Sequence, residues 1–193
     1  MATPCVVEWG MLGAMLLAVR YLVDRSRARD LSALYRRFAA APGPSEVSAE
    51  ERAAALALRA SREALSAALD GVEACGTCAR GHPLPHGRWS GGHCCGGPTE
   101  GVFTDDEVAA LKLSGTTPGR LSAPAAAHAG CAFRGPEGCS LAAADRPNLC
   151  VRYLCRGLER ELGERGDLPR IKALAREIDT VFRRFVALRA ARG

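Results

Sequence analysis

The sequence predicts a mainly α-helical protein whose helices pack around an irregular, cysteine-rich centre. Apolar residues recur at three- and four-residue steps on both sides of this centre, which is the spacing of amphipathic helices. Eight of the nine cysteines lie in the middle of the chain, among frequent glycines and prolines. We therefore expect one compact unit with three parts: an N-terminal helical hairpin (1–72), a cysteine-cluster metal-binding module (73–160) and a C-terminal amphipathic helix (161–193).

Two helices are predicted before the cysteines. Apolar residues at helical spacing define the first, and they are Leu12, Met15, Leu16, Val19, Leu22, Val23, Leu31, Leu34, Tyr35 and Phe38. Pro42-Gly43-Pro44 ends that helix. The second begins at Ser48, where Ser48-Ala49-Glu50-Glu51 fits a capping box, and it reaches Gly71. We expect the two helices to form a hairpin.

The beginning of the first helix raises the question of a membrane anchor. The stretch from Val6 to Val23 is apolar apart from Glu8 and Arg20. A membrane span needs about 20 predominantly apolar residues, and an acidic side chain makes insertion less favourable. We expect a soluble, buried helix in a cytoplasmic protein, with membrane association through this helix as the alternative.

The segment between Cys78 and Cys94 is rich in turn-forming residues and is expected to be a loop. Its three histidines, His82, His86 and His93, could enter a metal shell. No helix holds them on one face, and the cysteines already suffice for two four-thiolate sites. An exposed loop role for these histidines is therefore favoured over ligation.

Three short elements are predicted in the second half of the centre. Thr104 opens a helix that Gly115 ends, and the acidic residues of its first turn, Asp105 to Glu107, suit the helix dipole better than acid–base catalysis. Glycine and proline between Cys131 and Cys139 indicate a turn that brings these two cysteines together.

The third element is a helix that starts around Asp145-Arg146-Pro147-Asn148. Cys150 lies in its first turns, where the helix dipole is expected to lower the pKa of the thiol. Cys155 lies five residues further on, about 140° round an ideal helix, so it is not expected to face the same metal unless the helix is irregular.

The C-terminal region contains the clearest amphipathic helix. Its apolar face consists of Leu168, Ile171, Leu174, Ile178, Phe182, Phe185 and Leu188, with arginines opposite. We expect this face to pack against the N-terminal hairpin and the cysteine-rich centre, although a dimer or a partner helix could also use it.

The charge pattern argues against nucleic-acid binding. The net charge is +5, with 24 arginines and 2 lysines, but the arginine-rich stretches are interleaved with acidic residues and aromatic residues are few. A solvated helix face explains these arginines better than a nucleic-acid interface.

The cysteines themselves predict a metal site. Cys75-Gly76-Thr77-Cys78 has the CxxC spacing that zinc sites and iron–sulfur sites share. Disulfides are the alternative, but no cleavable signal peptide is expected, since the segment before the apolar run lacks a positive charge and contains Glu8. The thiols are therefore expected to stay reduced and to act as ligands, while Cys5, outside the cluster, is expected to remain unliganded.

The candidate ligands are eight thiolates: Cys75, Cys78, Cys94, Cys95, Cys131, Cys139, Cys150 and Cys155. Such sets suit zinc or an iron–sulfur cluster. The irregular spacing and the adjacent pair, Cys94 and Cys95, favour iron–sulfur slightly over zinc.

The motifs Cys75-Gly76-Thr77-Cys78, Cys94-Cys95, Cys131-Ala132-Phe133, Cys139-Ser140-Leu141 and Arg146-Pro147-Asn148-Leu149-Cys150 resemble the eight-cysteine pattern of the CxxCxxCC (YkgJ-type) proteins, which are described as zinc- or iron-chelating. The resemblance covers roughly residues 75 to 155 and implies that the eight cysteines are ligands. Two departures are the 15 residues between Cys78 and Cys94, where the family usually has two or three, and Val151 where an arginine is common.

Two classes of function follow. The first is a metal-binding protein whose centre is structural, chelating or electron-carrying, with an unidentified protein or redox partner. The second is an iron–sulfur-dependent enzyme, because flagellin lysine N-methylases are similar in carrying this cysteine module and transfer methyl groups to protein lysines. We favour the first class, since the sequence has no glycine-rich nucleotide loop after a strand and no convincing acid, base or nucleophile constellation.

Overall fold

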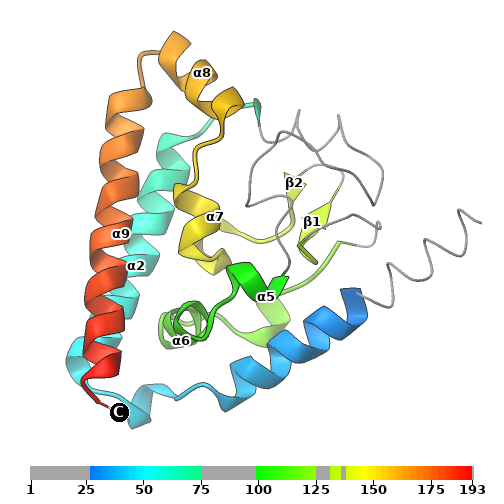
Figure 1. Cartoon of the computed structure of the whole chain (residues 1–193), viewed down its shortest axis with the longest axis vertical. Helices are drawn as coiled ribbons and strands as arrows, with labels where there is room; N and C mark the ends of the chain where they lie inside the picture. The colour runs from blue at the N-terminus through cyan, green and yellow to red at the C-terminus, as the bar shows by residue number, and fades with distance from the viewer. Residues whose placement is uncertain (1–26, 75–98, 125–130, 136–137, 193) are drawn as a thin grey trace, which may run out of the picture.

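The structure is a computed structural model that describes residues 27–74, 99–124, 131–135 and 138–192 (Figure 1). The described part is mainly helical, as predicted. A helix over residues 27–40 comes first. The elements that follow are η1 (Pro44–Glu46), α2 (Ala49–Ala68), α5 (Thr99–Val102), α6 (Asp105–Leu113), η2 (Pro118–Arg120), β1 (Arg134–Gly135), β2 (Gly138–Cys139), η3 (Ala143–Asp145), α7 (Asn148–Arg152), α8 (Arg156–Glu164) and α9 (Leu168–Ala190).

The two longest helices, α2 and α9, lie side by side and run in opposite directions (Figure 1). Ile171, Ile178 and Phe185 recur every seven residues along α9 and are fully buried against Leu58 and Leu65 of α2 and their neighbours. The predicted apolar face of the C-terminal helix is therefore confirmed. We call this packed region the long-helix core, and its buried members are Ala54, Ala55, Leu58, Leu65, Ala109, Ala110, Leu113, Val151, Leu158, Leu162, Ile171, Ile178 and Phe185.

A second group of buried residues lies beside the β-strands, and we call it the cysteine-side core. Its members are Leu34, Phe38, Val102, Phe103, Val108, Leu111, Leu121, Cys131, Phe133 and Leu141. The rings of Phe103 and Phe133 meet there with their centroids 5.3 Å apart. Helix α6 contributes residues to both cores, which explains why most of this nine-residue helix is buried.

The expected hairpin between the first two helices is wrong for the residues that the structure describes. Leu34 and Phe38 of the helix over 27–40 pack in the cysteine-side core, and Tyr35 Oη donates a hydrogen bond to the Leu121 carbonyl at 2.7 Å. Helix α2 instead packs in the long-helix core, and Figure 1 shows the helix over 27–40 running away from it. Both helices are amphipathic, but each buries its apolar face against a later part of the chain.

The predicted capping box at Ser48 forms only one of its two hydrogen bonds, and the start of α6 at Thr104 has the same arrangement. The hydroxyl oxygens of Ser48 and Thr104 accept hydrogen bonds from the amides of Glu51 and Glu107, at 3.0 and 3.3 Å. Neither glutamate carboxylate returns to its own cap. Glu51 instead binds Arg192 at the end of α9, and Glu107 binds Asn148 at the start of α7. Tertiary partners have replaced the local ones.

Within the described ranges, no helix is long and apolar enough to cross a membrane. The stretch from Val6 to Val23, on which the membrane alternative rests, lies outside those ranges.

Candidate metal centre

Three of the predicted ligands come together at the edge of the cysteine-side core. Cys131 precedes the β-hairpin, Cys139 ends strand β2, and Cys150 lies in α7. Strands β1 and β2 pair antiparallel, with Arg134 opposite Cys139 and Gly135 opposite Gly138. The predicted turn between Cys131 and Cys139 is thereby confirmed, and it places Cys139 opposite Arg134, three residues after Cys131.

The backbone around Cys131 is fixed by hydrogen bonds on both sides. The amide of Ala132 donates to Thr99 Oγ1 at 2.9 Å, and the amide of Arg134 donates to the Cys131 carbonyl at 3.1 Å. The Cys131 side chain itself is buried, whereas Cys139 is exposed. One thiol of the pair therefore faces the core and the other faces outward.

Cys150 is the third residue of α7, as the predicted helix start requires, but its electrostatics differ from expectation. Burial raises the pKa of the Cys150 thiol, and the neighbouring Cys131 and Cys139 raise it further. The expected lowering of this pKa by the helix N-terminus is therefore wrong, because the loss of hydration outweighs the dipole. The influence of Cys131 and Cys139 on Cys150 places the three thiols in one neighbourhood.

Cys155 is not brought to the same place. Helix α7 ends at Arg152, and Cys155 is the residue that precedes α8. Its side chain packs against the long-helix core, whereas Cys131 and Cys150 pack in the cysteine-side core. Cys150 and Cys155 are therefore separated, as predicted. The reason differs, because α7 ends between them and they do not lie on two faces of one helix.

The remaining candidate residues lie outside the described ranges. They are Cys5, Cys75, Cys78, His82, His86, His93, Cys94 and Cys95. Among the residues that the structure does describe, no group of three histidine, cysteine or acidic side chains is arranged to hold a metal ion. The chemistry of the three converging thiols fits a soft metal, but these thiols need further ligands to complete a site.

The structure also identifies a buried acidic residue, Glu107, which was predicted from the sequence to lie in a helix first turn in which acidic residues suit the dipole. Glu107 is 4% exposed. Its carboxylate accepts hydrogen bonds from the Asn148 amide, at 3.0 and 3.1 Å to its two oxygens, and from Asn148 Nδ2 at 3.1 Å. Burial raises the pKa of Glu107 from 4.5 to about 7, although the Asn148 hydrogen bonds and Arg62 oppose this shift.

Arg62 of α2 is a buried cation whose charge acts on Glu107. Its side chain is fully buried and donates from Nη2 to Ser114 Oγ at 3.3 Å, while burial lowers its pKa to about 10. Its Nε and Nη1 atoms have no hydrogen-bond partner among the described residues. Arg62 lies between Leu58 and Leu65 on the buried face of α2. This interruption of an apolar face is the signal in the sequence from which a buried charge could have been predicted.

Asp145 forms a second polar link between α6 and the segment that carries Cys150. It accepts a hydrogen bond from Thr116 Oγ1 at 2.7 Å and one from Arg120 Nε at 3.0 Å. Asp145 is therefore engaged by these two residues and does not cap α7, and Pro147 is the residue that precedes this helix.

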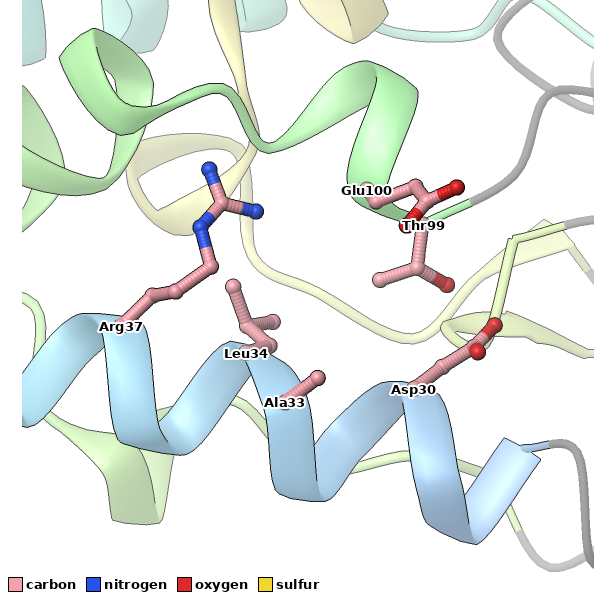
Figure 2. Close-up of a pocket in the computed structure, with 6 residues that line it drawn as sticks. All are labelled: Asp30, Ala33, Leu34, Arg37, Thr99 and Glu100. Carbon is pink, nitrogen blue, oxygen red and sulfur yellow. The ribbon is translucent and has the colours of Figure 1, made fainter.

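Two pockets of the described part are lined by none of the three cysteines. One lies between the helix over 27–40 and α5, has a volume of about 30 Å³ and is lined by Asp30, Ala33, Leu34, Arg37, Thr99 and Glu100 (Figure 2). This volume holds little more than a water molecule. A more open groove of about 220 Å³ is lined by Arg37, Ala40, Ala41, Pro42, Asp105, Val108 and Arg189.

The arginines of that groove are already paired with acidic side chains. Arg37 binds Asp105 at 2.7 Å, and Arg189 binds Asp106 at 3.2 Å. Neither pocket therefore offers a free cation for an anionic substrate, and the thiols remain the strongest chemical feature of the described residues. In comparisons with known proteins, no family model, no curated protein and no solved structure matches this chain.

Proposed function

We propose that this protein binds a soft metal through cysteine thiolates, as zinc or as an iron–sulfur cluster. The observation that supports the proposal is that Cys131 and Cys150 pack in the same cysteine-side core although they are separated in the sequence, with Cys139 at the end of the neighbouring strand β2. Cys139 is exposed, so its thiol lies where a metal ion could reach it.

The proposed ligand set combines these three thiolates with Cys75, Cys78, Cys94 and Cys95. Zinc bound by four thiolates would stabilise the fold, and an iron–sulfur cluster would supply electron transfer or an open iron position. We favour iron–sulfur, on the irregular spacing of the cysteines and the adjacent pair. Cys155 is left out of the set, because it packs against the other core.

The second candidate function is an iron–sulfur-dependent enzyme of the methyl-transferring type. Glu107 is the described carboxylate best suited to proton transfer near neutral pH, since its pKa is about 7. Its oxygens, however, are held by Asn148 at the start of α7 and are buried away from the two pockets. We therefore assign Glu107 a structural task and place the enzyme hypothesis second.

The metal is tested by anaerobic purification followed by elemental analysis for iron, zinc and acid-labile sulfide. Iron with sulfide and a broad visible absorbance supports a cluster, whereas colourless protein with about two zinc ions per chain supports a structural or chelating module. Protein that binds neither metal would contradict the proposal. Turnover of S-adenosylmethionine by the purified protein would favour the enzyme instead.

The ligand set is tested by comparing two cysteines of the same segment. Cys150→Ser is expected to lower the metal content and to reduce the free energy of unfolding, because the binding energy of a structural metal contributes to folding. Cys155→Ser is the matched control and is expected to retain the metal content of the wild type. Equal metal loss in both variants would show that Cys155 is a ligand and that the set is wrong.

A further inference from the structure

Glu51 and Glu107 occupy the same position in their helices and have different partners. Each is the third residue of its helix, each amide donates to the hydroxyl of the preceding cap residue, and each carboxylate is buried. The Glu51 carboxylate accepts from Arg192 Nε at 3.1 Å. The Glu107 carboxylate instead binds the first residue of the helix that carries Cys150.

Helix α7 depends on this contact because it lacks a cap of its own. The residue before it is Pro147, which makes no side-chain hydrogen bond to the helix. A helix N-terminus leaves its first amides without intrahelical partners, and the Glu107 carboxylate accepts from the first of these, on Asn148. Glu107 therefore performs, from α6, the task that a local cap residue usually performs.

The same contact fixes Cys150. The amide of Cys150 donates to the Pro147 carbonyl at 3.0 Å, so Asn148 and Cys150 belong to one helical turn. Glu107 is in turn held by its own cap residue, Thr104, and the charge of Arg62 of α2 acts on it. A path of hydrogen bonds thus runs from Thr104 through Glu107 to the backbone of the turn that carries Cys150.

We propose that Glu107 is a positioning residue of the metal centre, which holds α7 in the register that turns Cys150 toward Cys131 and Cys139. This inference rests on the proposed metal-binding function but concerns a residue that belongs to no cysteine motif. Asp145 supports the arrangement from the other side of Pro147, through Thr116 and Arg120.

The first test is a titration of the reduced, metal-free protein with Co²⁺, whose thiolate charge-transfer bands report the sulfurs bound. Glu107→Ala is expected to weaken Co²⁺ binding about 10-fold, the lower end of the effect of residues that orient metal ligands. It is also expected to reduce the charge-transfer intensity. Glu107→Gln keeps one acceptor oxygen for the Asn148 amide and is expected to restore most of the affinity.

Glu51→Ala is the matched control, because it removes a glutamate that is also buried. Glu51 lies in the first turn of α2, and this end of the helix lies away from the β-hairpin (Figure 1). It is expected to lower stability and to leave the cobalt spectrum and affinity within about twofold of the wild type, as a residue outside the ligand support would. Folded Glu107→Ala with wild-type affinity and spectrum would overturn the inference. An equal loss in Glu51→Ala would also overturn it, since the effect would then be general destabilisation.

A second measurement does not require metal. Iodoacetamide alkylates accessible cysteines, and peptide mass spectrometry follows the rate at each one in the metal-free, folded protein. In Glu107→Ala the alkylation rate of Cys150 is expected to rise, with the rate of Cys155 in the same protein as the internal reference. If the wild type binds neither Co²⁺ nor iron, the proposed function fails, and this rate alone decides the positioning role. Glu107→Gln is expected to keep the wild-type rate, and an unchanged Cys150 rate in Glu107→Ala would overturn the positioning role.

Discussion

The buried Glu107 carboxylate carries an energetic cost that depends on pH. In the folded protein its pKa is about 7, against an ordinary value of 4.5, mainly because burial removes hydration from the charged form. The folded state therefore binds this proton more tightly than the unfolded chain does. The stabilising contribution is complete below pH 4.5 and is lost as the pH rises toward 7, a difference of about 3 kcal/mol.

We expect Glu107→Gln to remove this dependence on pH, because the amide stays neutral. Urea unfolding of both proteins between pH 4.5 and pH 8 is the measurement. The free energy of unfolding of the wild type, taken relative to the variant, should fall by about 3 kcal/mol across this range. Parallel profiles would mean that Glu107 ionises in the folded protein as it does in the unfolded chain.

At the scale of single elements, the β-hairpin depends on a glycine. Gly138 has a φ of +115°, a backbone conformation that other residues adopt only with strain. It lies directly before Cys139 and pairs with Gly135, so its conformation decides where the second cysteine of the hairpin is placed.

Gly138→Ala is expected to destabilise the protein by about 1–3 kcal/mol, the cost of a strained backbone conformation. It is also expected to lower metal content, because Cys139 moves with the strand. Urea unfolding and elemental analysis measure the two effects. Gly119→Ala, at a glycine with open space around its Cα and no positive φ, serves as the control and should be nearly neutral. If Gly138→Ala and Gly119→Ala had the same free energy of unfolding, alanine at position 138 would not be strained.

At the scale of the whole molecule, two cores share one helix. Val108 and Leu111 of α6 face the cysteine-side core, and Ala109, Ala110 and Leu113 face the long-helix core. Helix α6 also carries Glu107, so the packing of α2 and α9 is coupled to the region of the thiols. We expect the two cores to unfold together.

Phe185→Ala tests this coupling from a position on α9 that belongs to the long-helix core. Phe185 is fully buried, and its loss is expected to lower the free energy of unfolding by about 3–5 kcal/mol. Leu56→Ala, at a side chain that is 51% exposed, should change it by less than about 0.5 kcal/mol. Urea unfolding followed by far-ultraviolet circular dichroism and by cysteine accessibility should give one shared transition for Phe185→Ala. Two separate transitions would show that the cores are independent.

The sequence by itself determined the elements whose signals are local. The period of the apolar residues predicted α9 and the helix over 27–40. The hydroxyl residues Ser48 and Thr104 predicted the starts of α2 and α6, and the glycines near Cys139 predicted the turn between β1 and β2. Cysteine spacing predicted the thiolate ligands, and of these the structure places Cys131 and Cys150 in the cysteine-side core.

Only the tertiary structure decided which faces meet and which charges are buried. The hydrophobic effect is non-directional, so the periodicity of an apolar face does not predict which element packs against it. Helix α2 packs on α9 and not on the helix that precedes it. Glu51 and Glu107 have the same local sequence context, yet one meets Arg192 and the other the start of α7. The reason is that burial and electrostatic neighbours come from segments far apart in the chain, and no local pattern of residues encodes them.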